Sequence, residues 1–165
     1  HIQLLKLFGA GRVFSSDVLN FRLEAAKRFG ADETINPRLE NLAERIRGMT
    51  EGRGVDVVVV ATGATEAIVQ ALRSVRRGGT VSLFGAPHRG ALLSYDVSDI
   101  FTREISIIPS YSTTELETNM ALRLLVSKRI DLNGLISHRF RLDRVIDAIR
   151  YAAEGKDSLK AVIIP

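Results

Sequence analysis

Strand-like and helix-like spacings of apolar residues alternate along the first hundred positions. Residues 55–60 form an almost unbroken β-branched run, which predicts a central strand buried on both faces. A helix over 65–75 should follow, ended by Gly78-Gly79, and residues 80–85 then predict another strand. This order predicts an α/β fold with a parallel sheet and crossover helices. The apolar face expected for the helix consists of Ala67, Ile68, Ala71, Leu72 and Val75.

Residues 1–10 have the pattern of the middle and end of a helix, with Gly9 as its C-cap. A dinucleotide-binding fold should begin before such a helix, with a strand and a Gly-x-Gly-x-x-Gly turn. We therefore expect a Rossmann-like doubly wound sheet that is truncated before its first strand and glycine-rich loop. Strands near Val13 and Val57 would then lack a shared neighbour. The alternative is a natural chain that starts with a short amphipathic helix. Its expected buried residues are Ile2, Leu4, Leu5 and Leu7.

Asp17 closes a short predicted strand and precedes a helix expected over 18–29. A carboxylate at this point can accept hydrogen bonds from the two hydroxyls of an adenosine ribose, whereas a 2'-phosphate would be repelled by it. The residue therefore favours NAD over NADP, with Arg22 along the same adenosine edge. Alternatively, Asp17 only caps the helix.

An ordered series of segments resembles the coenzyme-binding half of the medium-chain, zinc-type alcohol and polyol dehydrogenases. The resemblance covers essentially the whole chain. It is carried by residues 7–10, 13–17, 22–26, 29–36, 54–63, 78–80, 103–105, 110–112, 135–140 and 160–164.

The resemblance implies a set of coenzyme contacts. Thr62 and Gly63 would lie near the adenine-side ribose and the pyrophosphate, and residues Phe84, Gly85 and Ala86 would pass the nicotinamide. Pro109, Ser110 and Tyr111 fall where backbone groups reach the carboxamide, although Pro109 has no N–H to donate. Lys160 would face the pyrophosphate, or else is simply an exposed lysine.

Hydride transfer between a carbinol carbon and the nicotinamide, assisted by zinc, is the chemistry that the family implies. The sequence has no cysteine, and His1, His88 and His138 lack the spacing of metal ligands. Zinc and the catalytic residues are therefore expected only in an upstream part, and this chain alone is expected to be inactive. Ser112 stands where sorbitol-type members carry arginine, so the substrate stays open within small alcohols and carbonyl compounds.

The predicted organisation is an NAD-binding domain over residues 1–111 and a tail over 112–165 that returns toward the catalytic part. The tail should hold a helix over 113–129, a strand over 136–140, a helix over 143–154 and a final strand. Residues 105–108 predict an apolar edge strand, which favours a homodimer or larger homo-oligomer.

A formal charge of +4 raises the question of nucleic acid, but acids are interleaved with the basic residues, so nucleic-acid binding is not expected. No run is long and apolar enough for a membrane span, no signal peptide starts the sequence, and the lack of cysteine fits the cytoplasm. Two other functions stay open. These are a zinc-independent NADPH quinone or enoyl reductase, disfavoured by Asp17, and a non-catalytic nucleotide-sensing module, which gives no reason for the tail.

Overall fold

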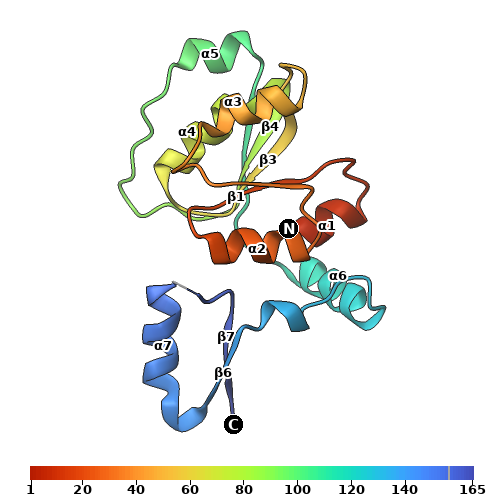
Figure 1. Cartoon of the computed structure of the whole chain (residues 1–165), viewed down its shortest axis with the longest axis vertical. Coiled ribbons are helices and arrows are strands. Elements are labelled where there is room, and N and C mark those ends of the chain that lie inside the picture. Colours follow the sequence, from red (N-terminus) through yellow and green to blue (C-terminus); the bar gives the residue numbers. More distant parts are fainter. Residues whose placement is uncertain (156) are drawn as a thin grey trace. The chain divides into compact units, whose positions relative to one another are not determined.

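The computed structural model describes residues 1–155 and 157–165, which fall into two compact units. Unit 1 comprises residues 1–36 and 113–165, and unit 2 comprises residues 37–112. Helices and strands alternate in both units, and every paired strand runs parallel to its neighbour (Figure 1). The predicted α/β class with parallel sheets is therefore confirmed.

Unit 2 is built on a three-stranded sheet with the order β3-β4-β5. Helices α3 and α4 pack against each other, and α4 contacts β3 and β4. The elements are α3 (Leu42–Met49), β3 (Val55–Val60), α4 (Thr65–Ser74), β4 (Val75–Leu83), α5 (Val97–Thr102) and β5 (Ser106–Pro109).

The core of unit 2 forms where α4 meets the sheet. Leu72 of the helix and Val81 of β4 are completely buried, and Val58 and Val60 of β3 pack against the same cluster. The helical face expected from the sequence is therefore the buried one. Burying a side chain of this size stabilises the unit by about 1.5–3 kcal/mol relative to an exposed one.

Two expectations for unit 2 are wrong. β3, an edge strand of its sheet, is not buried on both faces, because Val57 remains 51% exposed on the face that α4 does not cover. Gly78-Gly79 does not end α4, because the helix ends at Ser74 and β4 begins at once. The two glycines lie within β4, where the pairing with β3 shifts register and Gly78 has a φ of +63°.

Unit 1 contains two small parallel sheets, β1-β2 and β6-β7. Helix α2 connects β1 to β2, and α7 packs on β6 and β7. The elements are α1 (Ile2–Leu7), β1 (Phe14–Ser16), α2 (Asn20–Arg28), β2 (Glu33–Ile35), α6 (Glu115–Val126), η1 (Asn133–Leu135), β6 (His138–Arg141), η2 (Leu142–Arg144), α7 (Val145–Glu154) and β7 (Ala161–Ile164).

The first helix differs from its sequence expectation in burial. α1 ends at Leu7 and Gly9 follows in the left-handed region (φ +90°), so the predicted helix end is confirmed. None of its apolar residues is fully buried, however, and Ile2, Leu4, Leu5 and Leu7 are only partly covered. The helix is held partly by polar contacts, since the Gln3 side chain exchanges two 2.7 Å hydrogen bonds with the backbone of Asp131.

A hydrogen-bonded chain joins α7 to the sheet β6-β7. The Tyr151 hydroxyl donates to Asp157 and lies 2.9 Å from Nε2 of His138. The Asp157 carboxylate, together with partial burial, raises the pKa of Tyr151 to about 12. His138 and Tyr151 therefore brace the tail of unit 1, and neither is free to act as a metal ligand without breaking this contact.

Candidate nucleotide-binding site

Asp17 lies directly after β1, at the carboxyl end of the sheet β1-β2. Its side chain is 25% exposed, and its Oδ1 accepts a 2.9 Å hydrogen bond from the N–H of Leu19. Its Oδ2 lies 3.5 Å from Nη1 of Arg22, at the long limit of a hydrogen bond. The carboxylate therefore fixes the turn that leads into α2, and it retains lone pairs for further donors.

The structure bears on one of the two roles considered for Asp17, that of a helix cap. The carboxylate closes a turn, but the residue that caps α2 is Leu19, so Asp17 is not the helix N-cap itself. α2 begins at Asn20 rather than at position 18, because residues 17–19 are used by this turn. Only one carboxylate oxygen is committed to the backbone.

Asn36 is a neighbour that sequence reasoning missed. It follows β2 at the same carboxyl end, and its Nδ2 donates to Asn20 Oδ1 at 3.1 Å and to the carbonyl of Val18 at 3.5 Å. These bonds tie the end of β2 to the turn after Asp17. A polar residue directly after the second strand of a parallel pair was the signal that could have found it.

In unit 2, the loops after β3 and β4 approach each other backbone to backbone. The N–H groups of Phe84 and Gly85 both donate to the carbonyl of Val60, at 3.1 and 2.8 Å. A Cβ on Gly63 would lie 2.3 Å from the carbonyl oxygen of Ala86, and one on Gly85 would lie 2.4 Å from the backbone of Thr62. Glycine is therefore required at both positions. The five predicted residues of these loops are thereby brought together.

Ser110 and Tyr111 follow β5 at the same edge of the three-stranded sheet. The N–H of Ser110 donates to the carbonyl of Leu83 at 3.0 Å, which continues the ladder between β4 and β5. The side chain of Tyr111 is 95% exposed. Pro109 is the last residue of β5, as expected for a residue that cannot donate a ladder hydrogen bond.

Lys160 precedes β7 and is exposed. Its carbonyl accepts hydrogen bonds from the backbone of Ser137 and His138 and from the Ser137 hydroxyl. Within residues 1–155 and 157–165, its ammonium group has no hydrogen-bond or ion-pair partner. The backbone of Lys160 is therefore structural, and its side chain is available to solvent. Among the described residues of unit 1, no hydrogen bond or ion pair joins it to Asp17 or Arg22.

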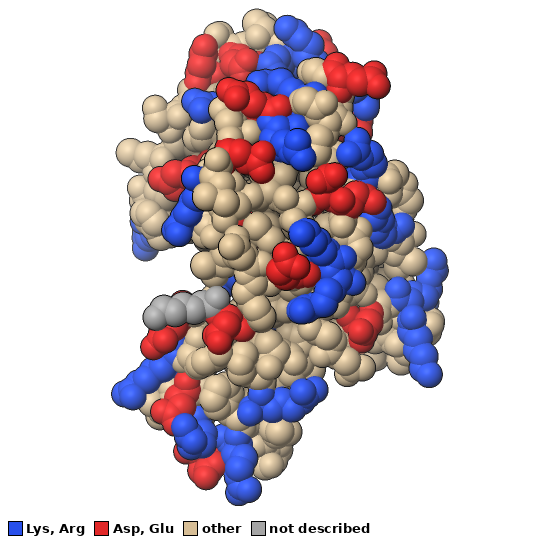
Figure 2. Space-filling view, viewed as in Figure 1, with Lys and Arg blue, Asp and Glu red and all other residues tan. Residues whose placement is uncertain are grey.

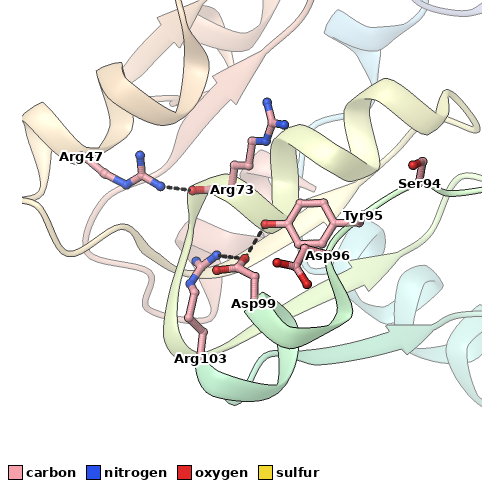
Figure 3. A pocket seen from close by; sticks show the side chains of 7 residues that line it. All are labelled: Arg47, Arg73, Ser94, Tyr95, Asp96, Asp99 and Arg103. Carbon is pink, nitrogen blue, oxygen red and sulfur yellow. Dashed lines mark hydrogen bonds and ion pairs between the residues drawn. The ribbon is translucent and has the colours of Figure 1, made fainter.

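A shallow depression in unit 2 lies away from these loops, at the amino ends of the strands (Figure 3). Arg103 crosses it and donates to the carbonyls of Leu72 and Val75 and, at 2.8 Å, to Asp99. The Tyr95 hydroxyl also donates to Asp99, at 2.6 Å. Hydrogen bonds from Tyr95 and Arg103 hold the pKa of Asp99 below its ordinary value, while burial and this carboxylate raise the pKa of Tyr95.

This depression is not a nucleotide site of the usual α/β kind, because those sites lie at the carboxyl ends of the strands. Its polar contacts instead anchor α5 to the end of α4, where the last carbonyls of a helix lack partners. Sequence reasoning missed it, since its residues come from separate elements. The arginines at positions 73, 76, 77 and 103 were the only available signal.

Residues 1–155 and 157–165 contain no group of three or more His, Cys, Asp or Glu side chains that could hold a metal ion. The sequence contains no cysteine. The described residues therefore offer no zinc site of either the catalytic or the four-thiolate kind. In the same residues, no helix has the length and apolar character needed to cross a membrane.

Parallel strands that end in small residues and in an acidic side chain define a nucleotide-binding domain of the α/β class. Comparison with known proteins agrees. The family model described as "Zinc-binding dehydrogenase" matches residues 1–127. Sorbitol dehydrogenase of Bacillus subtilis (strain 168) is 35% identical over 167 residues, covering 99% of this chain and 46% of that protein. An L-threonine 3-dehydrogenase of Symbiobacterium thermophilum is 30% identical, covering 99% and 47%.

A solved structure gives the same result. A zinc-binding dehydrogenase from Sinorhizobium meliloti 1021, bound to NADP, matches with a TM-score of 0.90 and 28% identity, covering 99% of this chain and 48% of that one. The chain belongs to the zinc-binding dehydrogenase family and corresponds to its coenzyme-binding half. It spans about half the length of the relatives that it matches. The resemblance seen in the sequence is therefore confirmed.

Proposed function

We propose that the chain binds NAD as the coenzyme-binding part of an oxidoreductase that transfers a hydride between NAD and a secondary alcohol or polyol. The observation that carries the choice of NAD is the Asp17 carboxylate, which keeps acceptor capacity at the carboxyl end of β1. In this role the carboxylate accepts hydrogen bonds from the two ribose hydroxyls, and Arg22 lies along the adenosine. The bound coenzyme supplies the hydride acceptor.

The remaining predicted residues have distinct parts in this proposal. The close backbone contact at Gly63 and Gly85 brings Thr62, Phe84 and Ala86 together, and in this proposal the coenzyme passes over them. Ser110 and Tyr111 offer groups to the carboxamide, and the Lys160 ammonium is available for the pyrophosphate. No residue of the chain is assigned a catalytic role. A zinc ion would be held by ligands outside the described residues.

The wider organisation is also part of the proposal. Residues 1–111 form the NAD-binding domain, and residues 112–165 return toward a catalytic part of the protein. The observation that supports a homodimer is that β5 is an edge strand, whose Ile107 and Ile108 are 38% and 53% exposed. The small-molecule substrate is an alcohol or carbonyl compound, and the protein acts in the cytoplasm.

NADP is the competing coenzyme, and the Sinorhizobium neighbour bound to NADP is the observation in its favour. Asp17→Asn separates the two, because asparagine can still accept the hydrogen bond from Leu19 but carries no charge. In the enzyme that contains this chain, we expect NAD affinity to fall about 10- to 100-fold, since hydrogen bonds to a charged group contribute roughly 1.5–3 kcal/mol. NADP affinity should rise.

Titration of NADH and NADPH fluorescence on the wild type, Asp17→Asn and Asp17→Ala measures both affinities. Asp17→Ala also removes the hydrogen bond to the N–H of Leu19. The difference in NAD affinity between Asp17→Ala and Asp17→Asn therefore measures what this bond contributes to binding. Unchanged NAD affinity in Asp17→Asn, with a loss only in Asp17→Ala, would show that the carboxylate serves the turn alone.

A further inference from the structure

Six arginine side chains gather around two adjoining depressions of unit 2. Arg47, Arg73 and Arg103 line the first depression, an open hollow of about 600 Å³ (Figure 3). The second shares Arg47, Asp99 and Arg103 with it and adds three more arginines, so the two form one continuous surface. The added arginines are Arg53, Arg76 and Arg77.

Three of these six guanidinium groups form no salt bridge among the described residues, although the charge of Arg77 helps to lower the pKa of the Asp99 carboxyl. Asp56 pairs with Arg53 and Arg76, at 2.7 Å each, and Asp99 pairs with Arg103. The other acid at this surface, Asp96, accepts hydrogen bonds from the backbone and hydroxyl of Ser98 at the start of α5. Within residues 1–155 and 157–165, the unpaired guanidinium groups are those of Arg47, Arg73 and Arg77.

Two of the three unpaired groups are nevertheless held in place. Arg47 donates to the carbonyl of Arg73 at 2.9 Å, and Arg77 donates to the carbonyl of Thr102 at 3.0 Å. A carbonyl orients a guanidinium group without neutralising it, and each group has five N–H donors. The Arg73 guanidinium makes no such bond among the described residues; Arg73 lines the first depression, and in Figure 3 its side chain extends away from Asp99 and Arg103. The Arg47 and Arg77 guanidinium groups are thus oriented by carbonyl groups that leave their positive charge in place.

We propose that this arginine surface binds a small anion of the polyphosphate type. Planar guanidinium forks bind phosphate oxygens in pairs, which lysine cannot do. The surface lies beside Arg76 near the start of β4 and Arg103 before the start of β5, whereas the candidate coenzyme residues of unit 2 follow the carboxyl ends of the strands. In unit 2, the arginine surface and the candidate coenzyme residues therefore lie at opposite ends of the strands of one sheet.

A compact anion fits the surface better than nucleic acid does. The arginines surround two depressions rather than forming a stripe that could follow a phosphate backbone. Over the face shown in Figure 2, basic and acidic side chains are interspersed, so no extended basic track is visible on that face. The ligand should therefore carry several negative charges within a short length, as tripolyphosphate does.

Isothermal titration calorimetry with sodium tripolyphosphate tests the proposal on the 165-residue chain. We expect binding at low ionic strength, weakened by added salt. Arg73→Gln/Arg77→Gln should bind at least about tenfold more weakly, a loss of about 1.4 kcal/mol or more. The matched control, Arg123→Gln/Arg139→Gln, removes the same charge from two exposed positions of unit 1 and should bind within about twofold of the wild type.

Thermal unfolding of each variant shows that it is folded. If the double variant does not fold, Arg73→Gln replaces it, because that side chain makes no hydrogen bond within the described residues. Equal weakening of binding in the two double variants would overturn the proposal and indicate unspecific charge attraction. The proposal would also be overturned if the wild type did not bind tripolyphosphate at low salt. A loss caused by Lys160→Gln, with none in Arg73→Gln/Arg77→Gln, would place the anion at the proposed coenzyme site instead.

Discussion

Arg103→Met should destabilise the fold more than any other exchange of a charged residue in unit 2. The Arg103 side chain is only 14% exposed, and it satisfies the carbonyls of Leu72 and Val75 and one oxygen of Asp99. Methionine fills similar volume but donates nothing, so two helix-end carbonyls lose this donor and the Asp99 carboxylate keeps the hydrogen bond from Tyr95 but loses its salt bridge.

The size of the effect follows from these three contacts. Each hydrogen bond contributes about 1 kcal/mol net, and the bond between two charged groups contributes somewhat more. We expect a loss of about 3 kcal/mol in the free energy of unfolding, which lowers the melting temperature by roughly 6–12 °C in a chain of this length. Arg103→Lys should recover only part of it, because a single ammonium cannot reach all three acceptors.

Urea unfolding followed by circular dichroism measures this loss. Arg53→Met is the matched control, because Arg53 is 60% exposed and bonds only to Asp56, itself 58% exposed. A pair this exposed should contribute no more than about 1 kcal/mol. The reasoning would be refuted if Arg103→Met lost no more stability than Arg53→Met.

Two further perturbations test other parts of the structure. Gly85→Ala places a Cβ 2.4 Å from the backbone of Thr62 and should cost about 1–3 kcal/mol in urea unfolding, while Gly11→Ala, with nothing within 4 Å, should cost far less. Lys6 and the N–H of Val13 lower the pKa of Asp32 from 3.8. Its stabilisation is therefore present above pH 3.8 and is lost as the pH falls through the lowered pKa. Asp32→Asn should reduce the loss of unfolding free energy between neutral and acidic pH, measured by urea unfolding at several pH values. An unchanged pH dependence would contradict the role given to Asp32.

Local signals in the sequence were enough for the elements and for part of the site. The β-branched run at 55–60 and the helical spacing over 65–75 identified β3 and α4 almost to the residue. Such patterns indicate which face of a helix or strand is buried, but not which other element covers it. They could not show that β3 lies at a sheet edge, and so Val57 was wrongly expected to be buried. The position of Gly78-Gly79 inside β4 was missed for the same reason, since a glycine pair is typical of both turns and bulges.

The sequence by itself determined the alternation of strands and helices, the family, and Asp17 at the end of a strand, because each depends on residues that are near one another along the chain. Only the tertiary structure brought Arg47, Arg73 and Arg103 around one depression and set the loops of Gly63 and Gly85 in backbone contact. Both depend on how parallel strands pair and on where the crossover helices end. Strand pairing joins residues that are distant in sequence, and hydrophobic periodicity carries no information about which distant residues meet.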